Sequence, residues 1–156
     1  MTKNKGLGLI YICYGAGLNV DFFQFMKFSN SGGVAIFEET TNIHYRFPGK
    51  HPFVLSGDLD AVHYDHAGNA LNNALEAVGG GTDLLICDEM LDTFLFNLLQ
   101  TEQSMELIKK CNNRIELVMT CRDVPPEIVE LADDVTEFVK EKYPYYSGAR
   151  ARKGIK

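Results

Sequence analysis

The chain has 156 residues, of which 46% are hydrophobic and 23% charged, a balance typical of one globular domain with a real core. Its formal net charge of −6 argues against a protein that binds nucleic acid, because such a protein needs a basic surface. No apolar run is long enough to cross a membrane, and residues 7–12 are too few for the core of a signal peptide. We therefore expect a single cytoplasmic domain over residues 1–156.

The first half of the chain predicts three strands. Residues 7–12 form an apolar run that predicts a strand, and the glycine-containing residues 13–19 predict a turn. Residues 20–26 are rich in aromatic side chains and predict a second strand. Residues 34–40 favour a short helix, and the alternating residues 43–47 predict a third strand.

From residue 59 the apolar residues recur three and four positions apart, which predicts an amphipathic helix to Val78. Ser56 or Asp58 is its expected N-cap, and three successive glycines follow it. His63 and His66 lie three apart on this helix. Without a third ligand in view, a surface position is favoured over a metal pair. The cysteines show no CxxC spacing, so neither a disulfide nor a zinc site is expected.

The second half alternates strands with helices. Residues 84–88 predict a strand buried on both faces, and a helical stretch follows with apolar residues between 91 and 99. Ser104 is expected to cap a short helix that ends at Cys111. A strand over 115–120, a helix from Pro125 to Ala132 and a last strand over 135–139 complete the predicted elements. The alternation predicts an α/β fold, a parallel sheet with helices on both faces.

The strand at 84–88 runs into two acids, Asp88 and Glu89. In open α/β sheets, ligands bind outside the carboxyl ends of the strands. A carboxylate there can hold Mg²⁺ or polarise a water beside a nucleotide phosphate. An apolar strand that ends in two solvent-facing acids is an equally good interpretation of this stretch alone.

Longer motifs point to one family. Residues 20–27 end in Gln-Phe-Met-Lys, and residues 120–125 read Thr-Cys-Arg-Asp-Val-Pro. Together with the acidic strand, these segments resemble the P-loop-type ATP:corrinoid adenosyltransferases, also called cob(I)alamin adenosyltransferases. Cys121 stands where that family has glycine, and Tyr143 where it usually has histidine. The segments that carry the resemblance are residues 20–27, 85–89, 120–125, 132–137 and 142–155.

The resemblance implies transfer of the 5′-deoxyadenosyl group of ATP to the cobalt of a reduced cob(I) corrinoid, with triphosphate as the leaving group. It implies that Glu89 and Asp88 bind Mg²⁺ and serve catalysis, and that Arg122, Thr120 and Lys27 bind ATP. Phe53 would contact the corrin ring, without the tryptophan expected beside it. The implied partners are ATP and cobalamin or another corrinoid, and the family suggests a homodimer.

One family motif finds no match, the phosphate loop (Walker A) with its Gly-Lys-Thr, which follows the first strand and opens a helix. Residues 13–19 are only seven, whereas parallel strands need a crossover of about a dozen. The sequence therefore predicts a P-loop-like fold that lacks the loop and most of its first helix, with the strand at 7–12 in a hairpin, at an edge or displaced. Neither Gly32-Gly33 nor the basic C-terminal residues replace the loop clearly. Alternatives to an active enzyme are a non-catalytic relative that binds a corrinoid or a partner protein, and a shortened product without function.

Overall fold

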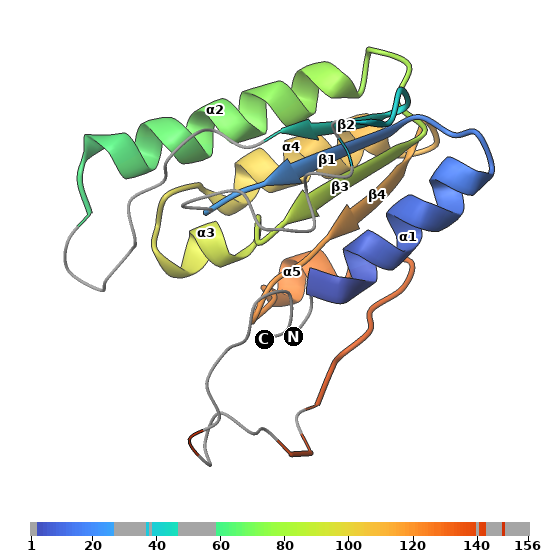
Figure 1. The fold of residues 1–156 in the computed structure, drawn as a ribbon. Helices are drawn as coiled ribbons and strands as arrows, with labels where there is room; N and C mark the ends of the chain where they lie inside the picture. Colours follow the sequence, from blue (N-terminus) through green and yellow to red (C-terminus); the bar gives the residue numbers. More distant parts are fainter. Residues whose placement is uncertain are drawn as a thin grey trace.

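The computed structural model describes residues 3–26, 37, 39–46, 59–139, 141–142 and 148, with side chains from residue 8 onward. These residues form a parallel sheet whose strand order is β2-β1-β3-β4 (Figure 1). The strands are β1 (Val20–Gln24), β2 (Ile43–Arg46), β3 (Leu84–Asp88) and β4 (Glu116–Met119). The helices are α1 (Lys3–Gly15), α2 (Ala61–Ala77), α3 (Asp92–Leu95), α4 (Thr101–Cys111) and α5 (Pro126–Val129).

The pairing register places the carboxyl ends of three strands together. Gln24 at the end of β1 pairs with Asp88 at the end of β3, and Cys87 pairs with Met119 at the end of β4. Every pair is parallel, so the residues that follow these strands all leave the sheet at one edge. This edge is where a ligand site is expected.

Helices cover both faces of the sheet, as predicted. Phe23 of β1 faces the cluster that contains the buried residues of α2 and α4, whereas Phe22 faces a second cluster with Ile10 of α1. Figure 1 shows α1 on the opposite side of the sheet from α2. All five residues of β3 are buried, because both of its faces are covered.

The helix α2 begins after Asp60 rather than at the expected caps Ser56 or Asp58, which lie outside the described residues. Asp60 accepts a hydrogen bond from Val62 N, and the ring of His63 closes the capping box, with Nδ1 3.1 Å from Asp60 N. His63 is only 2% exposed, so its expected surface position is wrong. Among the described residues, no group of three metal-ligating side chains is present.

The strand predicted over residues 7–12 is wrong, because these residues belong to the helix α1. The stretch is apolar on all sides, and such a short run does not distinguish a buried strand from a helix. Ile10 is the part of it that is buried against the sheet. Since residues 7–12 are helical, the crossover argument for a missing helix between residues 12 and 20 loses its premise. The absence of the phosphate loop stays a prediction.

The strand predicted over residues 135–139 is also wrong, since these residues have no regular structure. Their pattern is suitable for a strand, but Val135 and Val139 are 53% and 70% exposed, and no strand pairing covers them.

Smaller differences between prediction and structure concern the helix ends. The helix α4 begins at Thr101 after Gln100, so Ser104 is buried inside it rather than capping it. The helical stretches expected at 91–99 and 125–132 shorten to α3 and α5. Within the described part of the chain, no helix has both the length and the apolar character to cross a bilayer.

Candidate functional site

A chain of hydrogen-bonded side chains crosses the carboxyl edge of the sheet. Tyr45 Oη of β2 donates to Gln24 Oε1 of β1 at 2.7 Å, and Gln24 Nε2 donates to Asp88 Oδ2 of β3 at 2.8 Å. Thr120 Oγ1, just after β4, donates to Asp88 Oδ1 at 2.7 Å. These four residues, here called the strand-end network, join all four strands. Asp88 lies at its centre, 3% exposed, with both carboxylate oxygens engaged.

Glu89 differs from Asp88 in exposure and backbone conformation. Its φ is 60°, in the left-handed region that non-glycine residues rarely adopt, which costs about 1–3 kcal/mol. Its backbone N–H donates to Thr120 Oγ1 at 2.9 Å, which holds the turn at the end of β3. Glu89 is half-buried, so its carboxylate is the more accessible of the pair. Such strain at a strand end is common where a side chain is positioned for a ligand.

A third acid, Asp92, lies near this pair. Asp92, only 5% exposed, accepts a hydrogen bond from the backbone N of Arg122 at 2.7 Å, and its Oδ2 lies 3.9 Å from Arg122 Nε. Burial raises the pKa of the Asp92 carboxyl, and nearby Glu89 and Asp88 raise it further, against the lowering effect of Arg122. The Arg122 side chain itself is 84% exposed, and its guanidinium is accessible to an anionic ligand.

Tyr45 is held as a hydrogen-bond donor. Burial, and then the nearby Asp88 carboxylate, raises the pKa of Tyr45 to about 12. Its hydroxyl is therefore protonated at neutral pH and can donate to Gln24 throughout the physiological range. The hydrogen bond to Gln24 Oε1 places Tyr45 at one end of the strand-end network.

The structure brings Asp88, Glu89 and Thr120 together and connects Arg122 to them through Asp92. Lys27 and Phe53 lie outside the described residues. Sequence reasoning missed three residues of this edge. Asp92 stood in the same acidic stretch as Asp88, Gln24 opens the Gln-Phe-Met-Lys motif, and Tyr45 lies in the middle of the strand predicted over residues 43–47. These positions were the features of the sequence from which the three residues could have been identified. The residues missed are Gln24, Tyr45 and Asp92.

Beside this edge lies a recess of about 330 Å³ between α3 and the segment that leads into α5. Its walls are mostly apolar, with one acidic residue among them. We call it the Leu95 recess. It is lined by Leu91, Phe94, Leu95, Asp123, Val124, Pro125 and Pro126.

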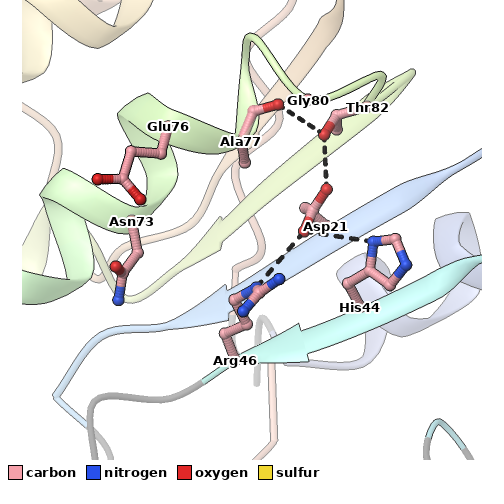
Figure 2. A pocket seen from close by; sticks show the side chains of 8 residues that line it. All are labelled: Asp21, His44, Arg46, Asn73, Glu76, Ala77, Gly80 and Thr82. Carbon is pink, nitrogen blue, oxygen red and sulfur yellow. Dashed lines mark hydrogen bonds and ion pairs between the residues drawn. The ribbon is translucent and has the colours of Figure 1, made fainter.

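A separate cavity of about 280 Å³ lies between α2 and the strands β1 and β2 (Figure 2). At its base, Asp21 is 5% exposed and accepts a hydrogen bond from Thr82 Oγ1 at 2.5 Å. His44 Nδ1 and Arg46 Nε lie 3.6 and 3.8 Å from Asp21 Oδ1. Figure 2 shows Glu76 across the cavity on α2. The buried carboxylate is thus balanced by its own neighbours, which indicates a structural role.

The comparison with known families bears on the whole chain. The sequence model described as ATP:corrinoid adenosyltransferase BtuR/CobO/CobP matches residues 3–156. No curated protein shows a significant match. The family match covers the strand-end network, Glu89 and the Arg122 segment alike, in agreement with the motifs in the sequence. The chain belongs to the ATP:corrinoid adenosyltransferase family.

Proposed function

We propose that this chain transfers the 5′-deoxyadenosyl group of ATP to the cobalt of cob(I)alamin or another cob(I) corrinoid. The family supplies the two substrate classes, ATP and a corrinoid. The observation that supports a catalytic role for this chain is the half-buried Glu89, fixed by Thr120 beside the exposed Arg122 at the carboxyl edge. An acid and a guanidinium at this edge match the needs of a metal-bound triphosphate.

The reaction requires no nucleophile from the protein. The electron pair of cob(I) attacks C5′ of ATP, a cobalt–carbon bond forms, and the C5′–oxygen bond breaks. Triphosphate leaves with that bond's electron pair, and the cobalt becomes Co(III). The protein therefore has to bind and orient both substrates and stabilise negative charge on the leaving group.

The residues present fit a magnesium ion that enters with ATP. Mg²⁺ usually takes one or two carboxylates together with phosphate oxygens and water, so a cage of three acids is not needed. Glu89 is the better ligand of the pair, because it is half-buried, whereas Asp88 is only 3% exposed. Asp88 lies adjacent and fixes Glu89 through the Thr120 hydroxyl. A bound Mg²⁺ would neutralise part of the charge on the departing triphosphate.

Other residues have proposed roles in substrate binding. Arg122 offers an exposed guanidinium to a phosphate, in the bidentate manner that suits arginine. Thr120 acts through its hydrogen bonds to Asp88 and Glu89. Lys27 follows β1, whose carboxyl end lies at this edge, and Phe53 is assigned to the corrin ring by resemblance.

The test is a spectral assay of chemically reduced cobalamin with Mg-ATP, which follows the light-sensitive adenosyl product. We expect turnover by the unmodified chain and a loss of roughly 10²-fold in kcat for Glu89→Gln, because a charge-stabilising group is removed. Glu102→Gln, an exposed acid-to-amide change in α4, is the matched control and should retain full activity. Equal activity of both variants would refute the role of Glu89.

The alternative is a non-catalytic relative that binds a corrinoid or a partner protein. The burial of Asp88 and the hydrogen bonds at both of its oxygens favour it, because they make this carboxylate a poorer metal ligand. It predicts corrinoid binding that does not depend on Mg-ATP and no adenosyl product. Equilibrium titration of the chain with cobalamin, with and without Mg-ATP, separates it from the enzyme.

A further inference from the structure

The Leu95 recess has no role in the proposed chemistry, yet it adjoins the residues that carry it. One wall comes from α3 and the turn before it, and the other from the segment before α5. Leu95 is 52% exposed, which leaves apolar surface open at the mouth of the recess. An apolar recess with a single polar group is the usual composition of a small-molecule subsite.

A single contact ties the two walls together. Leu91 is followed in the chain by Asp92, whose carboxylate accepts the hydrogen bond from Arg122 N, and Arg122 is followed by Asp123. The hydrogen bond between Asp92 and Arg122 N thus holds the two walls of the recess together. The recess is lined by residues that follow Glu89 and Arg122 closely in the chain.

The volume limits what the recess can hold. Ligand pockets generally span about 300–1,000 Å³. At about 330 Å³ the recess is at the small end of that range. This suits one flat ring system between apolar walls, whereas a corrin ring with its amide side chains is too large to be enclosed.

The carboxylate of Asp123 determines which flat ring the recess favours. Asp123 Oδ1 accepts a hydrogen bond from Val124 N at 3.0 Å. Within the described part of the chain, Oδ2 of Asp123 has no hydrogen-bond donor. A carboxylate oxygen accepts from the exocyclic amine of adenine, but it repels the carbonyl oxygen that guanine or hypoxanthine carries at the same place.

We propose that the Leu95 recess holds the adenine base of ATP and that Asp123 recognises its 6-amino group. This assignment rests on the proposed function, since it assumes that the triphosphate lies at Glu89 and Arg122. It makes Asp123 a specificity-determining residue and the apolar walls a platform for the base. Neither role needs Asp123 to touch the reacting atoms.

Calorimetric titration of the full chain with Mg-ATP, Mg-ITP and Mg-tripolyphosphate tests the proposal. ITP carries a carbonyl in place of the 6-amino group, and tripolyphosphate lacks the base. The unmodified chain should bind ATP more tightly than ITP, and Asp123→Asn should reduce that preference about tenfold, because an amide can donate to the carbonyl. Tripolyphosphate affinity should not change. Glu127→Gln, an exposed acid outside the recess, is the control and should keep the preference.

A second variant tests the apolar walls. Leu95→Asp places a charge at the exposed mouth and should weaken ATP at least tenfold while leaving tripolyphosphate unchanged. If ATP binds and is turned over, but both variants keep the ATP affinity and the preference over ITP, the adenine assignment is wrong and the proposed function stands. If neither ATP nor tripolyphosphate binds the unmodified chain, both proposals fail together.

Discussion

The hydroxyl of Thr120 makes two hydrogen bonds that hold the acidic pair. It donates to Asp88 Oδ1 at 2.7 Å and accepts from Glu89 N at 2.9 Å. Thr120→Val preserves the shape of the side chain and removes both bonds. The Glu89 amide then loses its acceptor in a turn that is already strained, at a φ of 60°.

The size of the effect follows from the partners. A hydrogen bond to a charged group contributes about 1.5–3 kcal/mol, and one between neutral groups about 0.5–1.5 kcal/mol. Because Thr120 is only half-buried, we expect the free energy of unfolding to fall by about 2–3 kcal/mol. For a chain of this length that corresponds to a melting temperature lower by roughly 4–12 °C.

Urea unfolding followed by circular dichroism measures this difference, with Thr120→Ser as the matched variant. Serine keeps the hydroxyl and loses one methyl group, so it should retain most of the stability. If valine and serine destabilise equally, or if valine stays within about 0.5 kcal/mol of the unmodified chain, the two bonds do not stabilise this edge.

Three further predictions concern other sites. Glu89→Gly should raise the free energy of unfolding by about 1 kcal/mol in urea melts, since glycine adopts a positive φ without strain, whereas Glu89→Ala should bring no gain. Thr82→Val should lower the free energy of unfolding by about 1.5–3 kcal/mol, because the buried Asp21 carboxylate loses a hydrogen-bond donor. An unchanged midpoint of urea unfolding would contradict this. Burial, then nearby acids, raises the pKa of the Cys121 thiol from 9.0 to about 11, so its reaction with a disulfide reagent at pH 8 should be about 100-fold slower than that of an ordinary thiol. Because the folded pKa is the higher one, the stability linked to Cys121 is present below pH 9 and lost as the pH rises toward 11, which urea melts across this range can check.

The elements that sequence reasoning predicted correctly have a strong local pattern. The 3.6-residue period of α2 corresponds to one arrangement, and the short apolar run of β3 was assigned to a strand with the help of the three glycines that precede it. The parallel sheet with helices on both faces followed from their alternation. The placement of Asp88 and Glu89 at the carboxyl edge followed in turn, because every parallel strand presents its carboxyl end there.

The elements that were missed depend on tertiary partners. The apolar residues of α1 suit a strand as well as a helix, and only their packing on the sheet decides between the two. Residues 135–139 have the composition of a strand but pair with no strand in the described structure. Gln24 and Tyr45 entered the site because β1 lies between β2 and β3, an order that local pattern does not determine.

The two adjacent acids at the end of β3 differ in burial and in hydrogen bonding. Asp88 is buried and hydrogen-bonded at both oxygens, so its carboxylate maintains the strand-end network. Glu89 is half-buried on a strained backbone, which costs stability and leaves its carboxylate accessible. Removal of charge at Asp88 should therefore lower stability first, and removal at Glu89 should lower turnover first, with little change in the free energy of unfolding. Under the proposed function, Glu89 binds the metal and Asp88 positions it through Thr120, since Asp88 is buried with hydrogen bonds at both oxygens and Glu89 is the more exposed of the two.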